Sequence, residues 1–299
     1  MKNILLTGAT GFIGKAFTEK LLHEGWCVHA ITRNSSAARF VLPQEVKVLA
    51  WNPEENGHLV LPPEDFHAVV HLAGESLAKW PWTARRKESL WRSRINSTRL
   101  LINAFREVAR KPSVFISASG MGYYGDGGER EVRVGDPPGK DFLAHLAAAW
   151  EGEALKAREL GINVVLPRFG MVLGSDGGVL PKMSLPFQWG LGAVLGDGNQ
   201  YWNWIHRNDV VELLFQALEN PAFHGPVHAV AGVPLTQRKF AGLLSQRLKR
   251  PLWWRVPVPC LRIALGEMAD LFLHGQKAVP DPTLFLPKVI SLEEALWMR

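Results

Sequence analysis

Cysteine is scarce in this chain of 299 residues, which contains only Cys27 and Cys260. Two cysteines so far apart, both among apolar neighbours, form neither the disulfide framework of a small secreted protein nor the thiolate set of a zinc site. We therefore expect no structural disulfide and no bound metal. This cysteine usage suits a reducing compartment.

Long apolar runs are absent as well. No run approaches the roughly 20 residues that a helix needs to cross a bilayer, so we expect no membrane span. Residues 1–3 lead directly into an apolar stretch and leave no room for a secretory signal. We therefore expect a cytoplasmic protein that does not bind a membrane.

Charge is nearly balanced, with 34 Lys and Arg residues against 28 Asp and Glu residues. The basic residues are spread out except for one run between Arg85 and Arg99, and no nucleic-acid-binding motif accompanies that run. The net charge of +6 therefore favours a protein that holds phosphorylated small molecules over one that binds nucleic acid. We expect a monomer or a homodimer.

Glycine forms the most informative pattern in the chain. Gly8, Gly11 and Gly14 follow an apolar run at 4–6 and open an amphipathic segment at 12–22, which is the strand–turn–helix context of a dinucleotide-binding loop. Such a turn brings the pyrophosphate to the N–H groups of the helix N-terminus. From this turn we expect cofactor contacts by Gly8, Thr10, Gly11, Phe12, Ile13 and Gly14.

The second expected strand ends in Thr32 and Arg33 and offers no acidic residue there. In a dinucleotide fold this strand end meets the adenosine ribose, where an acid selects NAD and an arginine pairs with the 2′-phosphate of NADP. The pattern favours NADP(H), with Thr32 and Arg33 at the ribose. A solvated surface arginine is the alternative.

The fourth expected strand ends in Leu72, Ala73 and Gly74, and Glu75 follows. Small residues at the carboxyl end of a parallel strand let the backbone lie against the cofactor. We therefore assign Leu72, Ala73 and Gly74 to the cofactor and Glu75 to the substrate. For Glu75 two alternatives remain open: it could face the cofactor, or it could cap the next turn.

Strand and helix patterns alternate through the first half of the chain, which is typical of a doubly wound parallel sheet. The expected strands are 3–7, 27–32, 46–50, 68–72, 113–118 and 162–167, and the expected helices are 12–24, 84–110 and 141–160. We predict an α/β, Rossmann-like fold with a smaller C-terminal subdomain on the substrate side.

Beyond Pro167 the segments become short and rich in Gly and Trp. A helix at about 208–219, a strand at 226–230 and a helix at 236–248 follow. We expect residues 1–168, with a return contribution from about 205–232, to form the cofactor domain. Residues 169–204 and 233–299 would form the substrate-side subdomain.

Several motifs resemble the extended short-chain dehydrogenase/reductase superfamily: the glycine turn with Phe12 and Ile13, the strand end 72–74, and the run 116–119 leading into Tyr124. Four more resemble its NADP-binding "epimerase family" branch, whose members are often labelled nucleoside-diphosphate-sugar epimerases or cell-division inhibitors. These are His71–Glu75, Trp91–Arg94, Gly190–Gly192 and Trp204–His206. The resemblance runs nearly end to end, and residues 250–296 are like the small domain that ends those proteins.

The resemblance implies hydride transfer, with Ser119 orienting a carbonyl and Asn96 positioning catalytic groups. It also implies a proton-transferring tyrosine followed four residues later by a lysine. This chain departs from that pattern, because none of its three tyrosines has such a lysine. We assign Tyr124 as the substitute proton donor, with a pKa near the ordinary value of about 10.

His145 and His206 are the other groups that could transfer the proton. We place Trp204 and His206 at the substrate, since the loops with Trp80, Trp82, Trp202 and Trp204 could form an aromatic platform. These tryptophans could equally belong to the core.

Two arginines, Arg94 and Arg168, could reach the cofactor or an anionic substrate, and Val172 completes the expected cofactor set. For the arginines, a surface or interdomain salt bridge is the alternative.

Two functions remain open. The first is an NADP(H)-dependent oxidoreductase or epimerase acting on a small hydroxyl or carbonyl compound, a nucleotide sugar among the candidates. The second is a non-catalytic NADP(H)-binding regulatory or sensor protein, as the missing tyrosine–lysine pair indicates. A tyrosine without its lysine keeps its proton at neutral pH, so an enzyme of this kind should favour reduction over the oxidation with which epimerisation begins.

Overall fold

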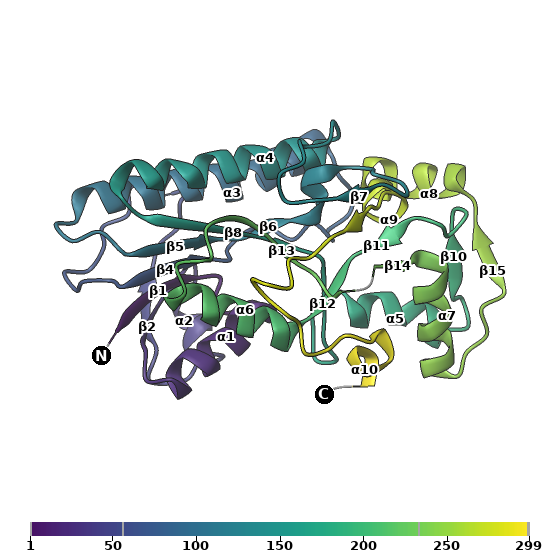
Figure 1. Ribbon diagram of the computed structural model, residues 1–299, viewed down its shortest axis with the longest axis horizontal. Coiled ribbons are helices and arrows are strands. Elements are labelled where there is room, and N and C mark those ends of the chain that lie inside the picture. The colour runs from purple at the N-terminus through teal and green to yellow at the C-terminus, as the bar shows by residue number, and fades with distance from the viewer. Residues whose placement is uncertain (1, 56, 233, 298–299) are drawn as a thin grey trace.

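The computed structural model describes residues 2–55, 57–232 and 234–297, and it is organised around a parallel sheet (Figure 1). Positions 1, 56, 233, 298 and 299 of the expected domains lie outside the described residues. The sheet order is β13-β8-β5-β4-β1-β2-β3, and β6 pairs with β8 beside this row. Every strand pair in the sheet is parallel. The predicted Rossmann-like α/β fold is confirmed. The strands are β1 (Asn3–Thr7), β2 (Cys27–Thr32), β3 (Lys47–Ala50), β4 (Ala68–His71), β5 (Val114–Ser117), β6 (Ser119–Gly120), β8 (Asn163–Phe169) and β13 (Gly225–Ala229).

Helices cover both faces of this sheet because successive strand residues point to opposite sides. Ile4 and Leu6 pack toward α1 (Phe12–His23), α2 (Ser35–Arg39) and α6 (Arg207–Glu219). Leu5 packs toward α3 (Ala84–Glu107) and α4 (Phe142–Leu155), which lie side by side on the other face (Figure 1). The carboxyl ends of the strands therefore meet at one edge, between the two helical layers.

The remaining elements gather beyond that edge of the sheet (Figure 1). They form short strand pairs around an apolar cluster that contains Trp202, Trp204 and Phe240. The strands are β7 (Glu131–Val132), β9 (Met171–Leu173), β10 (Ala193–Leu195), β11 (Tyr201–Trp202), β12 (Trp204–His206), β14 (Leu235–Thr236), β15 (Trp254–Val256) and β16 (Lys277–Ala278). The helices are α5 (Leu180–Gln188), α7 (Gln237–Leu248), α8 (Val258–Leu265), α9 (Asp270–Leu273) and α10 (Leu292–Trp297), and the 3-10 turns of the chain are η1 (Met121–Tyr124), η2 (Lys156–Leu160) and η3 (Gly266–Ala269).

Helices α2 and α5 are among those that were not predicted. Helix α2 has only five residues and starts at an Asn34 cap, whose side chain accepts a hydrogen bond from the Ala37 N–H. Helix α5 has nine residues and contains Pro186. Because proline disfavours the interior of a helix, this segment was not predicted to be helical. No helix in the described part of the chain combines the length and apolar character required to cross a membrane.

The glycine turn between β1 and α1 leaves no room for side chains. A Cβ on Gly14 would lie 2.1 Å from the Gly8 carbonyl oxygen, and Gly8 itself has a φ of +74°. By contrast, Gly152 in α4 has open space around it.

These contacts lead to a prediction about stability. Gly14→Ala should lower the free energy of unfolding by about 1–3 kcal/mol, because the methyl group forces backbone apart. Gly152→Ala, the control, should raise it by about 0.5–1 kcal/mol, because alanine is the better helix former. Urea unfolding of the two variants measures both changes. Equal effects of the two substitutions would contradict the close contact.

Candidate cofactor and substrate site

A cavity of about 560 Å³ lies at the carboxyl ends of β1, β2 and β4. Its wall contains residues of all three predicted cofactor segments: the glycine turn, the end of β2 and the end of β4. The predicted residues that line it are Gly8, Thr10, Gly11, Thr32, Arg33, Leu72, Ala73, Gly74 and Glu75. We call this space the cofactor cavity.

The glycine turn has the form that a diphosphate requires. Gly8 packs so closely against β4 that a Cβ would lie 2.8 Å from the Leu72 carbonyl carbon. Gly11 provides no side-chain cap for α1, so the first N–H groups of this helix remain available to phosphate oxygens. Lys15 also lines the cavity. The turn therefore fits the pyrophosphate of a dinucleotide.

Phe12, Ile13, Gly14 and Val172 were also predicted at the cofactor, but they line neither of the two cavities described here. The Phe12 ring lies against the loop 174–178, where a Cβ on Gly174 would come within 2.6 Å of it. The Arg207 guanidinium lies 5.0 Å from the ring centre and pairs with Asp176 of that loop at 2.6 Å. Phe12 therefore anchors the loop over the start of α1.

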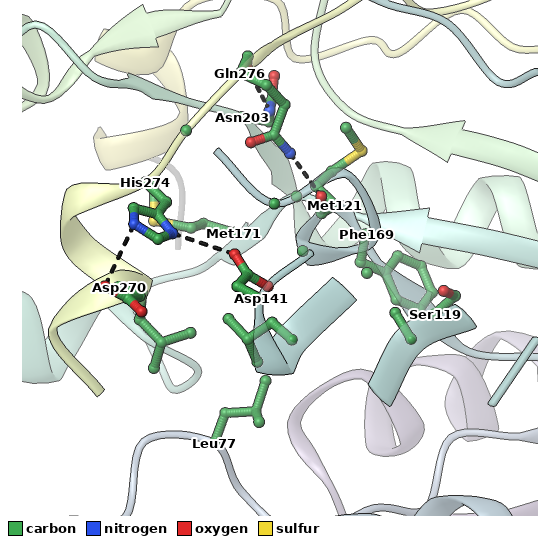
Figure 2. A pocket seen from close by; sticks show the side chains of 18 of the residues that line it. Leu77, Ser119, Met121, Asp141, Phe169, Met171, Asn203, Asp270, His274 and Gln276 are labelled. Atoms are coloured by element: carbon green, nitrogen blue, oxygen red, sulfur yellow. Dashed lines mark hydrogen bonds and ion pairs between the residues drawn. The ribbon is translucent and has the colours of Figure 1, made fainter. Parts of the chain in front are cut away.

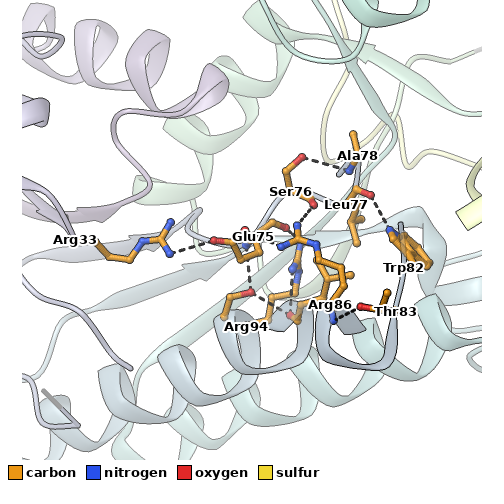
Figure 3. A network of polar contacts seen from close by, with 11 residues as sticks. Arg33, Glu75, Ser76, Leu77, Ala78, Trp82, Thr83, Arg86 and Arg94 are labelled. Carbon is orange, nitrogen blue, oxygen red and sulfur yellow. Dashed lines mark hydrogen bonds and ion pairs between the residues drawn. The ribbon is translucent and has the colours of Figure 1, made fainter. Parts of the chain in front are cut away.

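Glu75 lies in the wall of the cofactor cavity, between two arginines (Figure 3). Its carboxylate accepts hydrogen bonds from Arg86 Nη1 at 3.0 Å and from Arg33 Nη1 at 3.1 Å. These bonds, the Arg86 bond first, lower the pKa of Glu75 against the opposing effect of its burial. The structure thus places Glu75 on the cofactor side rather than at the substrate.

Arg94 lies where α3 passes the end of the cofactor cavity. Its Nη2 donates to the Glu75 carbonyl oxygen at 3.0 Å and its Nη1 to the Leu90 carbonyl oxygen at 3.2 Å. The guanidinium lies 5.2 Å from the centre of the Trp150 ring, and burial lowers its pKa to about 10. Both hydrogen bonds go to backbone carbonyls rather than to a carboxylate, and the Glu75 carboxylate acts on Arg94 only through its charge.

A second cavity, of about 330 Å³, begins at Arg94 and extends between α4 and the C-terminal region (Figure 2). We call it the substrate cavity. Ser119 lies in its wall, while the residues that α4 contributes are Leu143, Leu146, Ala147 and Trp150. The helix that should carry the tyrosine–lysine pair therefore presents only apolar side chains here.

Behind Ser119 a buried polar network continues away from the cavity. The Ser119 hydroxyl donates to Glu151 Oε1 at 2.6 Å. Glu151 forms a two-point ion pair with Arg168, at 2.8 and 2.7 Å, and Arg168 Nη1 donates to the Tyr124 hydroxyl at 2.5 Å. Since the Ser119 proton is engaged by Glu151, its oxygen is free only to accept.

The network ends at His228. Its Nδ1 lies 2.8 Å from the Val279 carbonyl oxygen, which can only accept, so Nδ1 carries the proton. Nε2, 2.5 Å from the Tyr124 hydroxyl, is then an acceptor for the phenol proton, and the Arg133 carbonyl oxygen, at 2.9 Å, is a second one. Burial lowers the pKa of His228, which agrees with a neutral ring. Tyr124 is thus enclosed by protein on every side of its hydroxyl.

Tyr124 and Arg168 therefore do not occupy the positions predicted for them. Their side chains are 1% and 2% exposed, and neither residue lines either cavity. Burial raises the pKa of Tyr124 to about 12, not the ordinary value that we expected. Arg168 forms a buried salt bridge with Glu151, which was the alternative considered for it. The Tyr124 hydroxyl is separated from both cavities, so it cannot donate a proton to a ligand bound in either of them.

Four other predicted residues also lie away from the cavities. Asn96 is exposed on α3, whereas Ser93 and Ser97 of the same helix line the cofactor cavity. His145 is exposed on α4. Trp204 is in the apolar cluster, and His206 is buried as the N-cap of α6, accepting from the Asn208 N–H at 3.3 Å. Of the expected aromatic platform, Trp82 and Trp204 belong to apolar clusters, whereas Trp202, also buried, lines the substrate cavity.

The sequence patterns did not point to His274, which is a titratable group of the substrate cavity. Its Nδ1 lies 3.2 Å from Asp141 Oδ2, and its Nε2 lies 3.3 Å from Asp270 Oδ1. All three residues line the cavity (Figure 2). The hydrogen bond with Asp141 raises the pKa of His274. No motif marks this histidine, because its partner Asp141 is the N-cap of α4, 133 residues earlier in the chain.

The Glu151–Arg168 pair leads to a second prediction. Arg168→Leu should lower the free energy of unfolding by about 3–5 kcal/mol, because it leaves the Glu151 charge buried without a partner. Arg99→Leu removes the half-exposed partner of Glu153 and, as the control, should cost less than about 1 kcal/mol. Chemical denaturation compares the two. Equal losses would contradict the structural role of Arg168.

Comparison with known proteins places these features in a family. The model of the NAD dependent epimerase/dehydratase family matches residues 4–231. The chain is 35% identical over 281 residues to the Arabidopsis thaliana "Epimerase family protein SDR39U1 homolog, chloroplastic", covering 93% of this chain and 80% of that protein. It is 34% identical over 286 residues to "Epimerase family protein YfhF" of Bacillus subtilis, covering 94% and 91%.

A solved structure agrees over the whole length. The human epimerase family protein SDR39U1 (isoform2), in a crystal structure with NADPH, superposes with a TM-score of 0.85 at 29% identity, covering 98% of this chain and 97% of the human one. The resemblance drawn from the motifs is confirmed, and the chain belongs to the NAD dependent epimerase/dehydratase family.

Proposed function

We propose that this chain is an oxidoreductase that binds NADP(H) in the cofactor cavity and reduces a small carbonyl compound in the substrate cavity. The observation that carries the proposal is that the two cavities are neighbours along α3. Ser93 and Ser97 line the first cavity, and Arg94 lines the second. A dinucleotide held at the glycine turn can therefore extend toward Ser119 and His274. When bound, its nicotinamide supplies or accepts the hydride, and the protein supplies position and proton transfer.

The choice of NADP(H) over NAD(H) rests on Arg33. It stands at the end of β2, where an acid would be needed to hold a free 2′-hydroxyl. One nitrogen of its guanidinium contacts Glu75, and its side chain is 63% exposed, so other donors remain for a phosphate. The NADPH in the human relative's structure supports this choice.

The role of Arg33 can be tested directly. Arg33→Ala should weaken NADPH binding about ten- to hundredfold, because a charge-assisted pair with the 2′-phosphate is lost, and should leave NADH binding nearly unchanged. Arg39→Ala is the matched control, since Arg39 lies close by in α2 and lines neither cavity. Fluorescence titration with both nucleotides measures the four affinities. Equal affinity of the native protein for NADPH and NADH would contradict the assignment.

Reduction is the favoured direction because the described wall of the substrate cavity lacks a tyrosine–lysine pair, and its histidine, His274, is held toward its protonated, acid form by neighbouring carboxylates. Alcohol oxidation needs a tyrosinate or an equivalent base near neutral pH. Among the described residues that line this cavity, the one tyrosine is Tyr201 and none is a lysine. Epimerisation begins with oxidation, so we place it behind simple carbonyl reduction.

Turnover tests the proposal as a whole. The native protein with NADPH should reduce at least one compound in a panel of aldehydes and ketones, followed by the absorbance of the reduced cofactor. The reverse reaction, alcohol with NADP⁺, should be much slower at neutral pH. NADPH binding without oxidation by any compound would instead support the regulatory or sensor function, which the apolar cavity face of α4 favours.

A further inference from the structure

His274 is held in the substrate cavity by acidic side chains from separate elements. Asp141 comes from the N-cap of α4, and Asp270 begins α9. Asp126, in the loop after η1, adds a third negative charge that acts on the imidazole. Figure 2 shows the ring between Asp270 and Asp141. The cluster depends on the tertiary fold, because residues near 141 and 274 meet only when the C-terminal region folds over the cavity.

The two ring nitrogens have different surroundings. The contact of Nδ1 with Asp141 has hydrogen-bond geometry, which makes Nδ1 a donor to that carboxylate. The contact of Nε2 with Asp270 is an ion pair at 3.3 Å. Arg262 of α8 pairs with the same Asp270 oxygen at 3.2 Å and competes for its charge. Asp141 therefore orients the ring and Nε2 keeps a proton that can be given up, the arrangement of an aspartate–histidine dyad.

The described residues contain no group of three or more His, Cys, Asp or Glu side chains arranged to hold a metal ion. A proton-transfer role therefore suits the cluster better than a metal role. His274 also lines a neighbouring cavity of about 650 Å³, together with Asp126, Arg255 and Arg262. An imidazole that borders both spaces can lose a proton on one side and regain it on the other.

We propose that His274 is the general acid of the reaction and that Asp141 is its positioning residue, replacing the proton-transfer half of the absent tyrosine–lysine pair. This inference rests on the proposed function, the reduction of a carbonyl compound in the substrate cavity. The site then serves small aldehydes or ketones whose oxygen reaches the His274 side of the wall.

In the proposed reduction, the carbonyl carbon accepts a hydride from the reduced nicotinamide, the carbonyl π bond breaks, and its electron pair moves to oxygen. The oxygen takes the Nε2 proton of the imidazolium. The substrate gains two electrons and two hydrogens to become an alcohol, NADPH is oxidised to NADP⁺, and neutral His274 regains a proton from water.

The pH dependence has a definite sign. Three carboxylates face the imidazole, and Arg262 offsets part of the charge of one. The hydrogen bond with Asp141 raises the pKa of His274 above its usual 6.5, so the imidazolium persists to higher pH than that of an ordinary histidine. The reduction rate should then be highest on the acid side of that pKa and fall as the pH rises through it.

The experiment compares His274→Gln, Asp141→Asn and the exposed control His145→Gln in NADPH-dependent reduction over a pH series. His274→Gln should lower kcat/KM by ~10²-fold or more, the usual cost of losing a positioned acid, with unchanged NADPH affinity. Asp141→Asn keeps the helix cap, since asparagine caps as well as aspartate does, and should move the alkaline limb of the profile to lower pH. His145→Gln should behave as native.

The outcomes separate the two proposals. A His274→Gln protein that retains native kcat/KM, or an Asp141→Asn protein whose alkaline limb does not move, would overturn the role of the dyad and leave the proposed reduction standing. A native protein that binds NADPH and reduces nothing in the panel would overturn the proposed function, and this inference with it. Recovery of activity in His274→Ala on addition of imidazole would support the general-acid role even if the glutamine variant were poorly folded.

Discussion

The buried ion pair between Glu151 and Arg168 is the interaction on which the substrate cavity depends. The Glu151 and Arg168 side chains are 6% and 2% exposed, and a buried charge without its partner would cost several kcal/mol. The pair joins α4 to β8, and through Ser119 and Tyr124 it also holds β6 and η1. One wall of the cavity is therefore held by an ion pair whose two residues do not themselves line the cavity.

This constraint also decides which groups remain for chemistry. Tyr124 and the proton of Ser119 serve the network, and the cavity face of α4 is apolar. The family's usual proton-transfer positions are thus either internal or absent. The titratable groups of the cavity lie instead at its opposite end, where His274 meets Asp141 and Asp270. In the proposed mechanism, the frame that holds the cofactor is kept, and the acid–base chemistry moves to the C-terminal region.

Sequence patterns predicted those parts of the molecule whose conformation depends on residues close together in the chain. The glycine turn, the arginine after β2 and the small residues after β4 are each encoded within a few residues, and the parallel sheet brings their strand ends together. Helix α3 was also predicted, although the face that it turns to the cofactor carries Ser93 and Ser97 instead of Asn96. The motif match identified the helix correctly. Which of its residues line the cofactor cavity depends on how the helix is rotated about its own axis, and a motif does not show this.

The remaining site residues depend on partners far away in the chain. Tyr124 is enclosed by Arg168 and His228, 44 and 104 residues later, so its role could not be read from the strand end where it stands. His274 lies in an apolar, proline-interrupted section without any motif, and only the folded chain brings it to Asp141. Sequence patterns report burial and turns, but they do not show which of ten histidines meets a carboxylate.

A crystal structure of the complex with NADPH tests the central claim, that one dinucleotide spans the cofactor cavity and delivers its nicotinamide to the substrate cavity. The account predicts the diphosphate at the N-terminus of α1, the 2′-phosphate at Arg33, and the nicotinamide ring beside Arg94, facing the space that Ser119 and His274 line. A nicotinamide directed out of that space, or a 2′-phosphate away from Arg33, would contradict it.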